Sequence, residues 1–256
     1  MRVRILGCSG GIGLGLRTTS ILVDDHILID AGTGVGDLTI GELKLIQHVF
    51  LTHSHLDHVA GLPLFLDSVF DDLVGRPLTV YARAETIAAL REHMFNGVIW
   101  PDFEALPSAD QPVLRFQTIA PGDRIELEAC SMRAVDVHHS VPSLGFCIEY
   151  GQRVFAFSGD TMTNEGLWPV LNAYPSLDVL VMEVSFPNNE QRLATDSGHH
   201  TPQTLAKELL KYKAPQDLAT MLYHIKPPFQ SEVELECAKL NGVNLQILQL
   251  DDQFVL

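Results

Sequence analysis

The sequence is poor in basic residues, and this shortage limits the partners that the chain can bind. Lysine and arginine together number 17 against 32 aspartates and glutamates, which gives a formal net charge of −15 at pH 7 over 256 residues. A protein that grips a nucleic-acid backbone uses lysine and arginine to displace counterions from the phosphates. We therefore expect a small-molecule partner and no duplex nucleic acid.

Cysteine is also scarce, and its spacing argues against disulfides. The four cysteines, Cys8, Cys130, Cys147 and Cys237, are far apart and form no CxxC pair. They are typical of buried thiols in a reducing compartment. The segment Met1–Leu6 contains neither a long apolar run nor a small-residue cleavage site. We therefore expect no signal peptide, no membrane contact and a cytoplasmic protein.

Short apolar strands and helical patterns follow one another along the chain, with no repeat and no Pro/Ser linker between them. This order predicts a single α/β domain over residues 1–256, in which two sheets are flanked by helices. The expected strands cover residues 3–6, 20–23, 26–29, 49–51, 78–81, 113–118, 125–127, 132–137, 146–150, 154–157, 179–182, 221–223 and 245–250. The expected helices cover residues 60–69, 84–95, 167–173, 201–212 and 232–240, and residues 107–112 are expected to form a loop.

The glycine-rich stretch from Gly7 to Gly15 resembles a nucleotide-binding turn only superficially. A dinucleotide fingerprint requires the glycines to open a helix. Here two short strands follow, Ser20–Val23 and His26–Ile29, joined at Asp24-Asp25 in the manner of a hairpin. The glycines are therefore expected to connect two strands, and a dinucleotide cofactor is not expected.

The densest group of metal-binding side chains follows the apolar run Val49–Leu51. His53 and His55 alternate, so in an extended segment they point the same way. Asp57 and His58 come next, where the chain is expected to turn into a helix. Imidazole and carboxylate ligands suit a borderline divalent ion such as zinc, and their density favours two ions over one.

Three later strands also end in candidate ligands. His138 and His139 follow one strand, Asp160 follows a second and His224 a third. Each is weak evidence alone, but strand-end loops are where α/β scaffolds hold their sites. One histidine of the pair His138-His139, together with Asp160, His224 and the four residues of the first group, gives seven ligands. A dinuclear centre needs about this number when water or hydroxide fills its open positions.

The succession His-x-His-x-Asp-His, His, Gly-Asp-Thr and a C-terminal His resembles the metallo-β-lactamase superfamily over essentially the whole chain. The resemblance implies a four-layer αβ/βα sandwich and two divalent metal ions. Zinc is the expected metal, and manganese or iron would also suit a His/Asp site. The residues implied as ligands are His53, His55 and His139 for one ion, Asp57, His58 and His224 for the other, and Asp160 as the bridge. In relatives the ligand lies six residues before the glycine of a Ser-x-Gly-Phe element, which selects His139 over His138.

The Asp bridge and the Gly-Asp-Thr motif place the chain near the phosphodiesterase branch of this superfamily. In that branch, tRNase Z-like nucleases carry residues that match Glu183 and His199 here. A carboxylate beside a histidine orients the ring and keeps it protonated, so that the pair can stabilise phosphoryl charge or protonate a leaving alkoxide. The implied catalytic residues are thus Glu183, His199 and Asp57. The plainer interpretation is that Glu183 and His199 are polar groups of a helix start and a loop.

Residues 92–96 and 98–103, within an expected helical insert at about 60–110 near the active site, resemble class II cyclic-nucleotide phosphodiesterases. Aromatic rings there could stack on a purine. An aromatic cluster that fills the core is the alternative. The candidate substrate-binding residues are His93, Phe95, Asn96, Trp100 and Phe103.

The expected function is hydrolysis of a small-molecule phosphodiester, specifically a 3′,5′-cyclic nucleotide, by a dinuclear metal-bound hydroxide that attacks phosphorus in line. His199 would protonate or stabilise the leaving 3′-oxygen, and a 5′-monophosphate would form. Three alternatives stay open: a tRNase Z-like RNA-processing nuclease, a hydrolase of another ester or a lactone, and a non-enzymatic metal or nucleotide sensor. The apolar segment Ile99–Pro101 is compatible with a substrate wall or with a homodimer contact.

Overall fold

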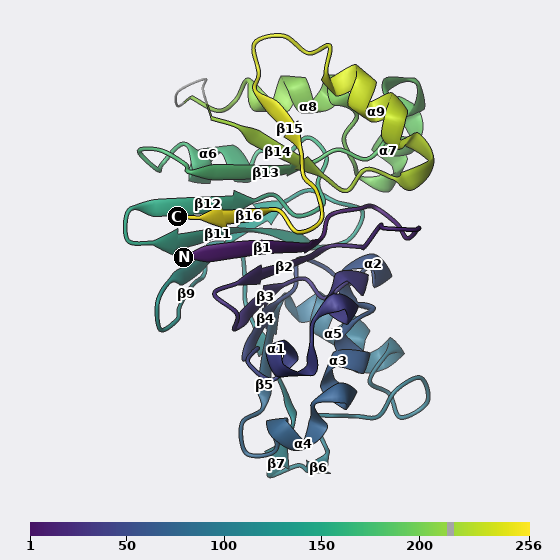
Figure 1. Cartoon of the computed structure of the whole chain (residues 1–256), viewed down its shortest axis with the longest axis vertical. Coiled ribbons are helices and arrows are strands. Elements are labelled where there is room, and N and C mark those ends of the chain that lie inside the picture. The colour runs from purple at the N-terminus through teal and green to yellow at the C-terminus, as the bar shows by residue number, and fades with distance from the viewer. Residues whose placement is uncertain (214–217) are drawn as a thin grey trace. The chain divides into compact units, whose positions relative to one another are not determined.

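The computed structural model describes residues 1–213 and 218–256, and these form two compact units (Figure 1). Each unit contains its own mixed seven-stranded sheet with helices packed against it, which confirms the predicted α/β class. The prediction of a single domain over residues 1–256 stays a prediction. The first unit consists of Met1–Gly7, Gly15–Ile119 and Leu250–Val255, and the second of Cys8–Leu14, Ala120–Gln249 and Leu256.

The first unit has the strand order β16-β1-β2-β3-β4-β5-β8, antiparallel from β16 to β3 and parallel from β3 to β8. Its strands are β1 (Arg2–Gly7), β2 (Ser20–Val23), β3 (Ile27–Ile29), β4 (His48–Phe50), β5 (Leu78–Ala82), β8 (Leu114–Thr118) and β16 (Gln253–Val255). Its helices are α1 (Ile40–Leu43), α2 (Leu56–Val59), α3 (Leu62–Ser68), α4 (Phe70–Leu73), α5 (Ala84–His93) and the 3-10 turn η1 (Thr33–Asp37).

The predicted hairpin of the first unit is confirmed. β2 and β3 pair antiparallel, and Asp24 and Asp25 between them adopt positive φ values of 45° and 64°. Tight hairpin turns require such left-handed residues, and aspartate tolerates them better than most side chains. β1 also pairs antiparallel with β2. The glycine-rich stretch therefore connects two strands, as predicted.

The second unit repeats this plan with the order β15-β14-β13-β12-β11-β10-β9, antiparallel from β9 to β12 and parallel from β12 to β15. Its strands are β9 (Arg124–Glu126), β10 (Ser131–Val137), β11 (Ser143–Tyr150), β12 (Arg153–Phe157), β13 (Val179–Glu183), β14 (Thr220–Tyr223) and β15 (Leu245–Ile247). Its helices are α6 (Leu167–Leu171), α7 (Gln191–Ser197), α8 (Pro202–Leu209), α9 (Gln230–Cys237) and the 3-10 turns η2 (Asn188–Glu190) and η3 (Pro227–Phe229).

Helices α6, α8 and α9 cover one face of the second sheet. Trp168, Leu205 and Val233 from these helices share an apolar core with Leu180 and Leu222 from the strands. Burying side chains of this size stabilises the fold by about 1.5–3 kcal/mol each. The Trp168 indole also satisfies its only donor, because Nε1 lies 2.7 Å from an oxygen of Glu208 on α8.

The C-terminal region differs most from the prediction. The strand expected over residues 245–250 ends at Ile247, and an unpredicted strand, β16, pairs with β1 of the first unit. β16 is short and largely exposed, so its apolar pattern is too weak to mark it in the sequence. The loop expected at residues 107–112 contains two short paired segments, β6 (Pro107–Ser108) and β7 (Gln111–Pro112). No helix in the described ranges is long and apolar enough to cross a membrane.

The strand directions decide where the candidate ligands lie. β10 is antiparallel to β11, which is antiparallel to β12, so β10 runs in the same direction as β12, β13 and β14. The carboxyl ends of these four strands therefore meet at one edge of the second sheet, the edge at which open α/β sheets bind ligands. In the first unit, β4 delivers the chain to the histidine-rich segment in the same way.

Candidate metal centre

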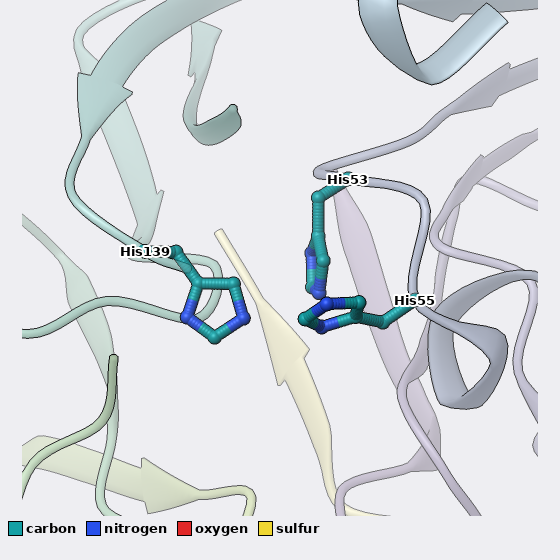
Figure 2. A group of neighbouring side chains, drawn as sticks. All are labelled: His53, His55 and His139. Carbon is teal, nitrogen blue, oxygen red and sulfur yellow. The ribbon is translucent and has the colours of Figure 1, made fainter. Parts of the chain in front are cut away.

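The first unit gathers three of its histidines at the end of β4. The His53 and His55 rings lie 4.6 Å apart in an edge-to-face arrangement, so the two alternate residues bring their rings together (Figure 2). His58, on the short helix α2, places its ring 4.2 Å from that of His53. His53 and His58 are fully buried, while His55 and Asp57 are partly exposed. Three imidazoles so close together make a donor set suited to a divalent cation.

Asp30 holds this segment in place. One of its oxygens lies 2.7 Å from Nδ1 of His58, and its carboxylate accepts hydrogen bonds from the backbone N–H and the hydroxyl of Thr52. Burial raises the pKa of Asp30, although the nearby His58 opposes this effect. Asp30 has a φ of 54°, a left-handed conformation that costs about 1–3 kcal/mol and is typical of functional sites.

The second unit presents His139, not its neighbour, to the sheet edge. Nδ1 of His139 is 2.9 Å from the carbonyl oxygen of Gly198, and the donor atoms of His139, Asp160 and His199 all lie within 4.8 Å of one another. His138 is exposed and its ring faces the carbonyl of Thr163. Burial lowers the pKa of His139, which favours the neutral imidazole that binds metal.

Asp160 and His224 are in contact with each other at the ends of β12 and β14. Nε2 of His224 is 3.0 Å from one oxygen of Asp160, and the hydroxyl of Tyr223 donates to the other oxygen at 3.0 Å. His224 has a φ of 68°, and its backbone N–H donates to the carbonyl of Cys8 at 2.7 Å. A bulky residue in this conformation is strained, which is expected where function fixes the side chain.

Glu183 and His199 form the carboxylate–histidine pair expected from the sequence. Nδ1 of His199 is 3.5 Å from an oxygen of Glu183, and both residues are buried. The other oxygen of Glu183 accepts the backbone N–H of His200 at 2.8 Å. Burial alone would raise the pKa of Glu183, but the charge and hydrogen bond of His199 outweigh it and keep that pKa below its usual value. Glu183 is therefore ionised at neutral pH.

The buried donor set fits divalent metal ions. In each of four buried histidines Nδ1 lies 2.7–3.0 Å from a protein oxygen, so Nε2 is the ring nitrogen that could bind a metal ion. Partners of this kind orient a metal-ligating histidine and increase its basicity. The pairs are His58 with Asp30, His53 with Thr52, His139 with Gly198, and His224 with Ser185.

The five predicted substrate-binding residues differ in their exposure and in the contacts that their side chains make. Phe95 and Phe103 are 4% and 2% exposed within the apolar core of the first unit, so their rings offer little surface to a base. Asn96 uses its side chain to hold its own turn, accepting the N–H groups of residues 98 and 99. Trp100 is partly buried against that core, and His93 is exposed beside Glu92.

Sequence reasoning missed three of the groups that orient the ligands. Thr52, Ser185 and the carbonyl of Gly198 contact histidines, yet their residue types carry no metal-binding signal. Gly198 and His139 are 59 positions apart, and Ser185 and His224 are 39 apart. Only the position of Ser185, two residues after Glu183 at a strand end, could have drawn attention to it.

The chain belongs to the β-lactamase superfamily. The family model described as "Beta-lactamase superfamily domain" matches residues 25–225. A probable 3′,5′-cyclic-nucleotide phosphodiesterase of Yersinia pestis is 30% identical, with 88% of this chain and 78% of that protein covered. The predicted resemblance to class II cyclic-nucleotide phosphodiesterases is thereby confirmed.

Two further comparisons define the fold and a second kind of relative. Unliganded yeast PDE1 superposes with a TM-score of 0.80 at 19% identity, covering 100% of this chain and 99% of the other, which confirms the predicted metallo-β-lactamase fold. A ribonuclease Z of Haloarcula marismortui is 28% identical over 64% of this chain and 52% of that protein. The fold, the family and the buried His/Asp donors together identify a metallohydrolase of this superfamily.

Proposed function

We propose that this protein is a metal-dependent phosphodiester hydrolase whose substrates are 3′,5′-cyclic nucleotides. The observations that carry the proposal are the buried histidines anchored through Nδ1 in each unit and, within the second unit, the buried pair of Glu183 and His199. Similarity to a probable cyclic-nucleotide phosphodiesterase over most of the chain supports the choice of substrate.

The proposed ligands are those that the sequence indicated, and zinc is the proposed metal. Their support is the burial and orientation of the rings within each unit, together with the suitability of imidazole and carboxylate for zinc. The proposed set is His53, His55 and His139 for one ion, Asp57, His58 and His224 for the second, and Asp160 as the bridging carboxylate.

The chain's own residues would position the reacting groups. Two bound divalent ions would supply a water that is deprotonated near neutral pH and would neutralise charge on the phosphoryl oxygens. The Glu183 carboxylate lies 3.5 Å from Nδ1 of His199 and would fix the orientation of that ring. His199 would then donate a proton to the leaving 3′-oxygen from Nε2, since Nδ1 faces Glu183 and Ser185.

Recognition of the base would depend on fewer residues than the sequence suggested. With Phe95 and Phe103 in the core and Asn96 engaged in its turn, His93 and the accessible part of Trp100 are the proposed contacts. A net charge of −15 supports a small substrate, because a large polyanion would be repelled.

A substrate panel tests this proposal against its rivals. The purified protein, loaded with zinc or manganese, is assayed with cyclic AMP, cyclic GMP, bis(p-nitrophenyl) phosphate, an acyl-homoserine lactone and a precursor tRNA. We expect turnover of cyclic nucleotides to exceed turnover of the lactone and the tRNA. A preference for precursor tRNA that weakens steeply with salt would instead identify an RNA-processing nuclease.

The two adjacent histidines provide a matched pair of variants for the same assay. His139→Ala should lose metal and turnover together, because the ring lies among Asp160 and His199. His138→Ala should retain both, because that ring is exposed. Equal loss in the two variants, or loss only in His138→Ala, would contradict the proposed ligand set.

A further inference from the structure

Ser185 occupies a position that the proposed mechanism does not use. It lies two residues beyond the end of β13 and is completely buried. Its backbone is fixed on both sides, because its N–H donates to the carbonyl of His200 at 3.0 Å and its carbonyl accepts the N–H of Lys226 at 3.1 Å. The hydroxyl therefore has little freedom to move away from the groups around it.

Four polar atoms surround the Ser185 hydroxyl, and three of them belong to the candidate site. Oγ is 2.9 Å from Oε2 of Glu183, 3.0 Å from Nδ1 of His224 and 3.2 Å from Nδ1 of His199. The fourth is the backbone carbonyl of His224 at 3.1 Å. One hydroxyl thus lies among a catalytic carboxylate, a catalytic histidine and a metal-ligating histidine.

The valence of a hydroxyl restricts how these contacts can be satisfied. A serine Oγ carries one proton to donate and two lone pairs to accept. The ionised Glu183 is both the nearest and the strongest acceptor, so the Ser185 hydroxyl donates its hydrogen bond to that carboxylate. The two remaining positions on Oγ can then only accept, and among the described residues the donors that face them are the Nδ1–H groups of His199 and His224.

We propose that Ser185 is a positioning residue that holds a proton on Nδ1 of both His199 and His224, so that Nε2 of His224 is the nitrogen for metal and Nε2 of His199 is the nitrogen that donates its own proton to the leaving group. The inference rests on the proposed function for the roles of the two rings. Glu183 acts on His224 through the same hydroxyl, because a Ser185 whose proton is directed to Glu183 presents its lone pairs to the two rings. Asp30 and the Gly198 carbonyl need no such partner, since they are acceptors already.

Three variants separate the hydroxyl from its surroundings. Ser185→Ala removes the acceptor, Ser185→Cys keeps nearly the same volume with a poor acceptor, and Ser185→Thr restores the hydroxyl. Ser143→Ala is the matched control, since Ser143, on β11 of the same unit, is equally buried and its Oγ has no hydrogen-bond partner among the described residues. If Ser185→Ala fails to fold, Ser185→Cys provides the comparison.

The first measurement is zinc affinity by competition with a chromophoric chelator. Loss of an outer contact to a metal-ligating histidine costs about 10- to 100-fold in metal affinity. We expect a loss in this range for Ser185→Ala and Ser185→Cys, recovery in Ser185→Thr and no change in Ser143→Ala. A Ser185→Ala protein that binds zinc as tightly as Ser143→Ala would overturn the proposal.

The second measurement is histidine ring NMR on the metal-free protein, which does not depend on zinc or on substrate. Wild-type protein should give slowly exchanging Nδ1–H signals for His199 and His224, both should weaken or vanish in Ser185→Ala and Ser185→Cys, and Ser185→Thr should restore them. Unchanged signals in Ser185→Ala would reject the role of Ser185. Failure of wild-type protein to bind zinc, with the signals behaving as expected, would reject the proposed function alone.

Discussion

Two residues of the candidate centre are held in backbone conformations that lower the stability of the fold. Asp30 and His224 both have left-handed backbone conformations, with φ of 54° and 68°. Each such residue is expected to cost about 1–3 kcal/mol. The hydrogen bonds of Asp30 to Thr52 and of the His224 N–H to Cys8 offset this strain. Backbone strain at Asp30 thus accompanies a fixed orientation of the His58 ring, and backbone strain at His224 accompanies a fixed orientation of its own ring.

Removal of a proposed ligand should abolish metal binding and catalysis together. His53→Ala removes a buried imidazole, and Asp160→Ala removes the proposed bridging carboxylate. We expect both variants to lose bound metal, measured by elemental analysis after dialysis, and to lose phosphodiesterase activity in parallel. The exposed Asp136 on β10 provides a control, since Asp136→Asn should change neither quantity. Full turnover in either ligand variant would contradict the site.

Two of the cysteines should be chemically inert in the folded protein. Burial raises the pKa of Cys147 and of Cys237 to about 12 each. At pH 8 the thiolate of such a group is only about one part in ten thousand, and the thiolate is the reactive form. We expect neither to react with iodoacetamide until the protein is unfolded in guanidinium, as followed by mass spectrometry. Rapid native-state labelling of either residue would show that the burial is wrong.

The pair of Arg4 and Glu42 should make a contribution to stability that is lost in acid. The hydrogen bond from the Arg4 guanidinium, with those from Thr39, lowers the pKa of Glu42 from 4.5 to about 2. A lowered carboxylate pKa stabilises the fold above pH 4.5, and this contribution is lost as the pH falls from 4.5 towards 2.

Comparison with Glu42→Gln isolates this effect, because the acid titration of all other groups is common to both proteins. Urea unfolding should find Glu42→Gln less stable than wild type at pH 6, with a smaller difference at pH 3. The difference is small, since the Glu42 side chain is 30% exposed. A difference that stays constant between these pH values would contradict the lowered pKa.

The junction between α7 and the following loop links a backbone turn to the orientation of His139. Gly198 ends α7 with a φ of 80°, and a Cβ there would lie 2.9 Å from Nδ1 of His139 and 2.7 Å from the backbone nitrogen of Ser140. The Gly198 carbonyl is also the group that Nδ1 of His139 faces. Glycine is therefore needed at this position for both backbone conformation and close approach.

Gly198→Ala should reduce stability and metal affinity, while Gly151→Ala should reduce stability alone. Both glycines have positive φ, so each substitution should cost about 1–2 kcal/mol of folding free energy. At Gly151 no atom of the described residues, apart from the two chain neighbours, lies within 4 Å of the added Cβ, so only the backbone strain remains. Urea unfolding and zinc titration of the two variants test this. Equal zinc affinity in both would show that His139 does not depend on the close approach of Gly198.

The elements with strong apolar patterns were predictable, and the weakly patterned ones were not. Strands such as β5 and β13 contain continuous buried runs, so their positions follow from composition alone. β16 was missed because its stability comes from pairing with β1, which is nearly the whole chain length away. Helix α7 was also missed, since only Ala194 of its residues is buried.

The candidate ligands were predictable from the sequence because metals require a few distinctive residue types at strand ends. The groups that orient these ligands were not, because they are ordinary residues brought to the site by long-range folding, as Ser185 and Gly198 illustrate. The role of the aromatic residues could not be predicted either, because the sequence would contain Phe95 and Phe103 whether they filled the core or lined a binding site. Burial alone separates these cases.

At the scale of the whole molecule, family membership and the buried His/Asp donors identify a metallohydrolase. The central claim to test is that its substrates are 3′,5′-cyclic nucleotides. The direct test is incubation of the zinc- or manganese-loaded protein with 3′,5′-cyclic AMP in ¹⁸O-labelled water, followed by mass spectrometry of the nucleotide product. The account predicts 5′-AMP carrying one ¹⁸O on phosphorus, formed by wild type and by His138→Ala but not by His139→Ala. Unreacted cyclic AMP in a preparation that retains its metal, or 3′-AMP as the product, would contradict it.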